Sequence, residues 1–321
     1  MTPRPLSMAP LDWLMLIGLS FLWGGAFFLN KIALAELPPL MVAFARVGIA
    51  AVILLAIAGM RDELRPVRAA WPTFILLGLI NSAVPFALIA WGQTHIASGL
   101  AAIINATVPL FAVLIANATT EDDKLTRGRL IGLGCGLTGV IVMIGPGALS
   151  GLGLHIAGEL ACLTAAALYA AGTVYARRLR NLAPNTLAAG QTGAATLLLL
   201  APVAFLDQPW TLTLPSARGL GVLVGLGALS TALAYLLYFR ILSRAGATNT
   251  TLVTFLIPVS AILLGVLVLK ERLEPHQLVG MEAIATGLLA LDGRAGKGLA
   301  ALGGWIARQC KEFRANGRSS V

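Results

Sequence analysis

The chain has 321 residues, of which 58% are hydrophobic and 12% are charged, and its formal net charge is +9. With a mean hydropathy of +0.86 it has too few polar side chains to cover a soluble globule, so the class of water-soluble proteins is excluded. The composition instead predicts a protein that lies in a lipid bilayer.

Apolar, largely uncharged runs of the length that crosses a bilayer, about 20 residues, recur along the whole chain. Lipid leaves only helices and closed barrels, and barrel strands would be about 10 residues long and alternating, so we expect an all-α membrane protein. The first run is too long for a signal peptide and lacks a clear cleavage site, which predicts a retained helix. The ten predicted transmembrane helices cover residues 12–31, 38–59, 70–91, 96–117, 129–146, 154–176, 184–206, 217–239, 246–269 and 276–292.

Basic residues are distributed unevenly between the predicted loops. With the N-terminus in the cytoplasm, most of the 23 Lys and Arg residues fall on the cytoplasmic side. The positive-inside rule therefore predicts that both termini are cytoplasmic. This topology and contact with anionic lipid explain the net charge, so no nucleic-acid partner is expected. We expect a cytoplasmic N-terminus over residues 1–11 and a basic cytoplasmic tail over residues 293–321.

The same five-helix pattern occurs twice. Residues 12–146 can be laid over residues 154–292, and Pro109 then coincides with Pro258. Because five is an odd number, the second copy must enter the membrane in the opposite orientation, which gives two inverted repeats. Inverted repeats can rock about a shared midplane and so predict a transporter that works by alternating access. The competing interpretation, a chance likeness between apolar helices, is disfavoured by the matching prolines.

Polar and aromatic side chains recur at helical spacing on one face of several predicted helices. Pro109 and Pro258 fall near mid-span, where a proline frees a backbone carbonyl that needs polar surroundings. We therefore expect both helices to bend around a central, uncharged, water-filled cavity, although aromatic residues at such spacing can also serve packing. The residues predicted to line this cavity and bind substrate are Trp23, Phe27, Asn30, Asn81, Ser82, Phe86, Asn105, Pro109, Tyr169, Ser230, Thr231, Tyr235, Tyr238, Asn249, Thr250, Thr254 and Pro258.

Three ionisable residues, Arg46, Glu159 and Glu282, lie at similar predicted depths within the membrane. Charges at such depths are costly and call for a partner or a function. We expect Arg46 to form a structural ion pair with one of the two glutamates, and the alternative is that it binds a substrate carboxylate. The polar faces contain no Asp or Glu, which favours facilitated flux over proton coupling. They also contain no Lys or Arg, which disfavours phosphorylated substrates.

Signatures of catalysis and of metal binding are missing from the sequence. The three cysteines and three histidines are isolated, and no predicted helix offers a nucleophile with a base or clustered carboxylates. We therefore expect no enzyme activity, no cofactor and no metal ion. The expected partners are a small-molecule substrate and the lipid bilayer, with function as a monomer.

Three stretches resemble EamA-type members of the drug/metabolite transporter superfamily. They are "FLWGGAFFLNKIAL" (21–34), "SGLAAIINATVPLFAVLI" (98–115) and "LLGVLVLKERLEPHQLVGMEAIATGLLAL" (263–291), the last including Glu271. The resemblance implies ten helices, cytoplasmic termini, a cavity lined by spans 1, 3, 4, 6, 8 and 9, and export of small metabolites. Within the superfamily, the chain resembles most the branch of bacterial amino-acid exporters that includes YddG, and this resemblance implies a place in the cytoplasmic (inner) membrane of a bacterium. Glu271 is the single glutamate of the family pattern and has a capping role in the second copy. In the first copy an acidic cluster stands at the matching place, and either Glu121 or Asp122 could have the same role.

Amides, hydroxyls and tyrosine rings suit a zwitterionic, partly apolar solute. We therefore expect export of amino acids, aromatic or other apolar ones. The alternative is an exporter of drugs or organic cations, which would need a carboxylate within the first span, where only Asp12 stands at the edge.

Overall fold

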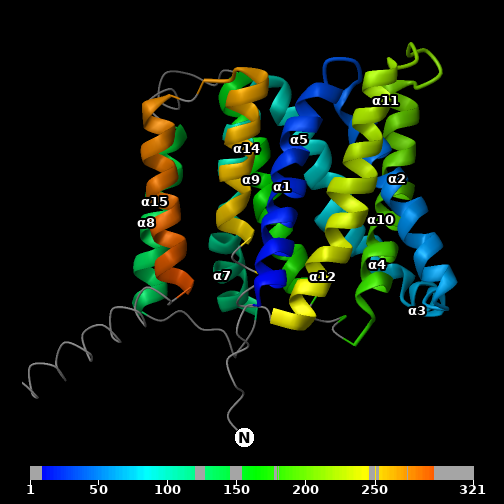
Figure 1. Ribbon diagram of the computed structural model, residues 1–321, viewed down its shortest axis with the longest axis horizontal. Helices are drawn as coiled ribbons and strands as arrows, with labels where there is room; N and C mark the ends of the chain where they lie inside the picture. Colours follow the sequence, from blue (N-terminus) through cyan, green and yellow to red (C-terminus); the bar gives the residue numbers. More distant parts are fainter. Residues whose placement is uncertain are drawn as a thin grey trace, which may run out of the picture.

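The computed structural model is a bundle of helices, and its described residues contain no strand (Figure 1). The structure describes residues 9–119, 127–144, 154–176, 179, 181–245, 250, 253–272 and 274–292. Seven helical segments in this part are long and apolar enough to cross a membrane. They are Pro10–Ala33, Pro39–Met60, Trp71–His95, Ser98–Thr119, His155–Ala176, Pro184–Asp207 and Ala217–Tyr238, and shorter apolar helices cover Leu130–Val142, Leu256–Leu269 and Leu278–Gly287.

Several of these segments consist of more than one helix. Prolines open α1, α2, α10 and α15, where the missing N–H costs nothing because the first turn has no partner for it. The elements are α1 (Pro10–Ala33), α2 (Pro39–Met60), α3 (Leu64–Ala69), α4 (Trp71–Gly78), η1 (Leu79–Ala83), α5 (Val84–His95), α6 (Ser98–Asn105), α7 (Val108–Thr119), α8 (Arg127–Ile144), α9 (Leu154–Ala176), α10 (Pro184–Pro202), η4 (Val203–Asp207), α11 (Ala217–Val224), η5 (Gly225–Leu233), α12 (Ala234–Ala245), α14 (Val253–Leu269) and α15 (Pro275–Asp292).

The helix around Pro109 is broken, whereas the helix around Pro258 is continuous. α6 ends at Asn105 and α7 begins at Val108, with Thr107 closing the turn through a hydrogen bond from its Oγ1 to the Ile104 carbonyl at 2.6 Å. α14 runs through Pro258 without interruption. The predicted distortion is therefore a clear break only in the first copy.

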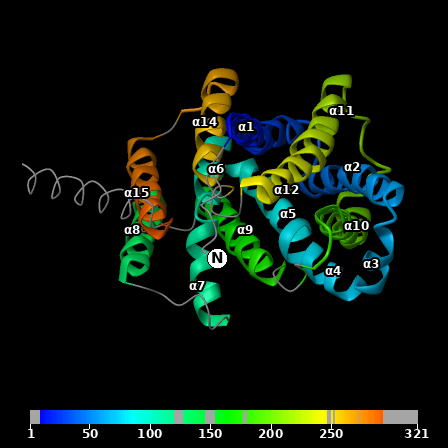
Figure 2. The ribbon, with the colours of Figure 1, turned by 60° about the horizontal axis from the view of Figure 1, so that its bottom comes forward.

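Glycines bring the helices of the bundle close together. A Cβ added at Gly24 of α1 would lie 2.9 Å from the backbone nitrogen of Ala261 in α14, and Ser260 Oγ donates to the Ser20 carbonyl at 2.7 Å. α8 and α15 pack in the same way, since a Cβ at Gly139 would lie 2.7 Å from the Gly280 carbonyl oxygen. Both views show this second pair side by side at one margin of the bundle (Figures 1 and 2). Small residues therefore allow these two helices to approach closely.

Candidate functional site

A buried arginine lies where four helical segments of the bundle meet. Arg46 of α2 is 9% exposed, and its Nε donates a hydrogen bond of 2.9 Å to Thr231 Oγ1 in η5. Its guanidinium carbon lies 3.9 Å from the ring centroid of Phe86 in α5, which is a cation–π geometry. The Phe86 ring in turn makes a T-shaped contact with the Tyr169 ring of α9, with ring centroids 6.1 Å apart. We call these four residues the Arg46 cluster.

The Arg46 cluster lacks a counter-ion in the described part of the chain. Glu159 is buried, with its Oε1 3.5 Å from His155 Nδ1, and Glu282 is exposed on α15. The expected ion pair of Arg46 with either glutamate therefore does not form in this structure. Arg46 from the second span reaches Phe86 and Thr231, two residues of the face that was expected to be uncharged. Spacing along one helix could not reveal this meeting of separate helices.

Arg46 therefore has unused hydrogen-bonding capacity. A guanidinium carries five N–H donors, and the bond to Thr231 is its sole hydrogen bond within the described residues. A buried cation without an anion is unfavourable, and a planar guanidinium suits a carboxylate bound through two parallel hydrogen bonds. The arrangement can therefore hold a small organic anion.

An amide pair lies on the adjoining helices. Asn81 Nδ2 in η1 donates to Gln191 Oε1 in α10 at 3.0 Å. The Tyr235 hydroxyl of α12 faces the side chains of Ser82 and Gln191. Gly172 of α9 makes room for this pair, because a Cβ there would lie 2.6 Å from Asn81 Oδ1. The sequence interpretation missed Gln191, whose only signal is an amide between small residues in "AAGQTGAA".

The polar residues of the third and eighth spans stand on π-helical segments. Asn81 and Ser82 lie in η1, and Ser230 and Thr231 lie in η5. Thr231 Oγ1 also donates to the Leu226 carbonyl, five residues earlier, at 2.9 Å. A π turn inserts an extra residue into the helix and re-aims the side chains around it, and such segments are frequent at functional sites. Both copies of the pattern therefore use the same local distortion at corresponding places.

The remaining predicted cavity residues fall into smaller groups. Trp23 of α1 packs against Tyr238 of α12 with ring centroids 5.4 Å apart. Asn30 is satisfied within the protein, since its Nδ2 donates to Gln93 Oε1 at 2.6 Å while Gln93 Nε2 donates to the Phe27 carbonyl at 2.9 Å. The sequence did not predict Gln93 as the partner of Asn30.

The residues near the two prolines differ in how deeply they are buried. Asn105 Oδ1 is buried and has no hydrogen-bond partner in the described ranges, and Thr250 is buried as well. Thr254 and Pro109 are half-buried, and Pro258 is buried in α14. Asn249 lies outside the described residues.

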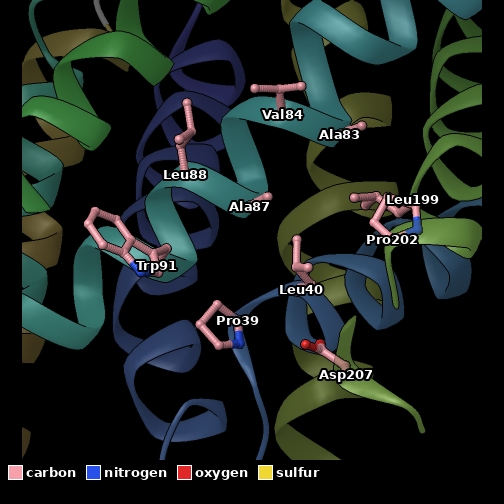
Figure 3. Close-up of a pocket in the computed structure, with 10 residues that line it drawn as sticks. All are labelled: Pro39, Leu40, Ala83, Val84, Ala87, Leu88, Trp91, Leu199, Pro202 and Asp207. Atoms are coloured by element: carbon pink, nitrogen blue, oxygen red, sulfur yellow. The ribbon is translucent and has the colours of Figure 1, made fainter. Parts of the chain in front are cut away.

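A pocket of about 490 Å³ is lined in part by α5, and no residue of the Arg46 cluster is among its lining residues (Figure 3). None of the predicted binding residues lines it. Its single charged residue, Asp207, uses Oδ2 to accept a hydrogen bond from the Met41 backbone N–H at 2.7 Å. The lining residues are Pro39, Leu40, Ala83, Val84, Ala87, Leu88, Trp91, Leu199, Pro202 and Asp207. Within the described ranges, no group of three or more His, Cys, Asp or Glu residues could hold a metal ion.

Comparisons with known proteins relate the whole bundle to transporters. The model of the EamA-like transporter family matches twice, over residues 12–145 and 156–291. The uncharacterized inner membrane transporter YedA of Escherichia coli (strain K12) is 30% identical over 259 residues, which cover 78% of this chain and 80% of YedA. The protein PecM of Dickeya dadantii (strain 3937) is 28% identical over 275 residues, which cover 84% of this chain and 88% of PecM. These relatives do not single out YddG, so that part of the resemblance stays a prediction.

A solved structure has the same fold. One protein crystal structure aligns with a TM-score of 0.64 at 19% identity and covers 89% of this chain and 98% of that chain. The two matched segments fit a duplicated repeat, while the ten-helix count, the inverted orientation and the side of the termini stay predictions. The apolar helices and the relatives agree on a multi-pass transporter of the inner membrane. The chain belongs to the EamA-like transporter family.

Proposed function

We propose that this transporter exports amino acids, aromatic or other apolar ones, by alternating access between two inverted five-helix repeats with cytoplasmic termini. The observation that carries the proposal is the buried Arg46 guanidinium, which bonds Thr231 and has no carboxylate partner among the described residues. A substrate carboxylate would supply the missing anion in a site of low dielectric, where a charge-assisted hydrogen bond is strong.

The neighbours of Arg46 suit the rest of an amino acid. The Phe86 and Tyr169 rings offer an apolar wall for a hydrophobic or aromatic side chain. Asn81 uses its Nδ2 on Gln191, which leaves its Oδ1 as an acceptor for a substrate ammonium group. Asn81 and Tyr169 are only half-buried, so substrate-sized groups can approach them. The Arg46 cluster and the neighbouring Asn81 can therefore bind the two ends of a zwitterion.

Facilitated flux down the amino-acid gradient is the transport mode that fits this cluster. Neither the Arg46 cluster nor the bonded pair of Asn81 and Gln191 includes an Asp or Glu that could carry a proton with the substrate. Net movement would then follow the concentrations on the two sides as the repeats rock.

The alternative is an exporter of drugs or organic cations with the same fold. The apolar pocket that ends at Asp207 favours it, because a lipophilic cation needs apolar walls and a carboxylate (Figure 3). Two features count against it. Arg46 would repel a cation, and Asp12 is already paired with Arg244 Nε at 2.8 Å.

Flux into proteoliposomes containing the purified transporter separates the two functions. We expect uptake of L-phenylalanine, weaker uptake of 3-phenylpropionate, which lacks the amine, and at least about tenfold lower uptake of phenethylamine, which lacks the carboxylate. Uptake should be unchanged when the pH gradient is dissipated. If tetraphenylphosphonium is carried and L-phenylalanine is not, the amino-acid assignment is wrong and the alternative holds.

A further inference from the structure

Three carboxylates cap helix N-termini at the end of the bundle opposite the start of α1 (Figure 1). Glu36 follows α1, Asp207 ends η4, and Glu271 follows α14. Each accepts a hydrogen bond from the backbone N–H of a residue more than 160 residues away in the chain. We call these contacts the carboxylate clamps.

The first clamp joins Glu36 to the start of α11. Its Oε2 accepts from the Ser216 N–H at 2.7 Å, and its Oε1 accepts from the Ser216 hydroxyl at 2.8 Å. Gly219 leaves space for the carboxylate, since a Cβ there would lie 2.5 Å from Glu36 Oε2. The Ser216 hydroxyl and N–H, helped by Arg218, hold the pKa of Glu36 below its usual value, so the clamp is charged at neutral pH.

The second clamp joins Asp207 to the start of α2. Its Oδ2 accepts from the Met41 N–H at 2.7 Å. Met41 lies in the first turn of α2, where backbone N–H groups have no partner within the helix. The carboxylate therefore satisfies a donor and meets the positive end of the helix dipole.

The third clamp joins Glu271 to the start of α6. Its Oε1 accepts from the Ser98 N–H at 2.9 Å, and its Oε2 accepts from the Ser98 hydroxyl at 2.7 Å and the Gly99 N–H at 3.3 Å. Gly265 makes room here as Gly219 does for Glu36, because a Cβ at Gly265 would lie 2.5 Å from Glu271 Oε2. Lys31 lies near this carboxylate and donates from Nζ to the Ile96 carbonyl at 3.0 Å.

All three clamps cross between the two matched segments of the chain. Glu36, Met41 and Ser98 belong to residues 12–145, and their respective partners Ser216, Asp207 and Glu271 belong to residues 156–291. Carboxylate and N–H groups at the membrane surface can exchange these bonds for water, so such contacts can open and close without exposing buried apolar surface. They have the placement and the reversibility that a gate between two moving halves needs.

We propose that the three carboxylate clamps are positioning contacts that form the gate at this end of the transporter. The proposal rests on alternating access, part of the proposed function, but not on the identity of the solute. The clamps hold the two repeats together in the present state, and they break each time the transporter opens to this side. With cytoplasmic termini, this is the outer side of the membrane.

Distances between spin labels on either side of the gate test the proposal. Labels at Thr94 and Thr213, both exposed, are placed in the full-length chain in nanodiscs, with the three cysteines replaced by alanine. Glu36→Gln, Asp207→Asn and Glu271→Gln should each raise the ratio of open to closed distances, on the order of tenfold, and the triple variant should raise it further. The matched control is Asp12→Asn, which removes a carboxylate from the opposite end and should not raise this ratio.

Two results would overturn the gate. One is a triple variant that is monodisperse and keeps the distance distribution of the parent. If the triple variant does not fold, the pair Glu36→Cys with Ser216→Cys decides, in the chain whose three native cysteines are replaced by alanine. This pair is oxidised to the disulfide first, and the labels are then attached to cysteines at positions 94 and 213 through thioethers, which dithiothreitol does not cleave. Oxidation should abolish the open distances, and dithiothreitol should restore them; open distances that persist in the oxidised pair contradict the proposal. These distances do not depend on which solute is carried. The gate proposal can therefore be contradicted while amino-acid export is supported by the flux measurements, and amino-acid export can be contradicted while the gate proposal is supported.

Discussion

Replacing Arg46 by methionine is expected to abolish saturable uptake of L-phenylalanine, with a loss of roughly 100-fold or more in kcat/KM. The substrate carboxylate loses its partner, whereas the protein loses one hydrogen bond to Thr231 and a contact with Phe86. Because Arg46 makes no ion pair with either glutamate, methionine should leave folding intact. The measurement is initial uptake into proteoliposomes at matched protein content, with size-exclusion profiles as the readout of folding.

Two variants give this prediction its controls. Arg46→Lys keeps the charge but not the planar fork, so an intermediate loss is expected. Arg65→Met removes an exposed arginine from α3 and should transport like the parent. Misfolding of Arg46→Met would support a structural role, and unimpaired uptake would remove Arg46 from the binding site altogether.

Gly24→Leu is expected to prevent stable folding, because the new side chain enters the contact of α1 with α14. Its Cβ would lie 2.9 Å from both the Ile257 carbonyl oxygen and the Ala261 nitrogen, which are backbone atoms and cannot turn aside. Overpacking of this kind costs about 3 kcal/mol or more when backbones must separate. The yield of monodisperse protein and its melting temperature in detergent measure the effect.

The matched control lies on the same helix. Gly18 has open space around it, with no atom within 4 Å of an added Cβ, so Gly18→Leu should leave folding and melting temperature unchanged. Equal damage from the two leucines would show that helix flexibility, and not close packing of α1 on α14, explains the need for glycine.

The helices themselves could be predicted closely from the sequence. The predicted runs 38–59 and 184–206 correspond to Pro39–Met60 and Pro184–Asp207, because apolar length and an initial proline are local properties. The π-helical segments η1 and η5 could not be predicted, since a single extra residue in a helical turn leaves no clear trace in an apolar pattern.

The candidate site was predicted less completely, for a related reason. Helical spacing placed Phe86, Thr231 and Asn81 on inward faces, because periodicity reports which side of one helix is polar, and in the structure Phe86 and Thr231 are buried and Asn81 is half-buried. It did not show that Arg46 of another helix would reach them or that Gln191 would bond Asn81, since these contacts depend on how helices pair.

For Glu271, too, the sequence pointed to the residue but not to the groups that it contacts. The family pattern drew attention to this residue, and the structure supplies its partners, Ser98 and Gly99. Glu36 and Asp207 carried no such pattern and were not predicted. Glu121 and Asp122, the possible counterparts in the first copy, lie outside the described residues.

The position of a bound substrate tests the central claim most directly. Crystals of the transporter with 4-bromo-L-phenylalanine would locate the bromine by its anomalous scattering and the carboxylate by its density. We predict the carboxylate within hydrogen-bond distance of the Arg46 guanidinium and the bromine beside Phe86 and Tyr169. A bromine in the apolar pocket between Trp91 and Leu199, with Arg46 unoccupied, would contradict the account.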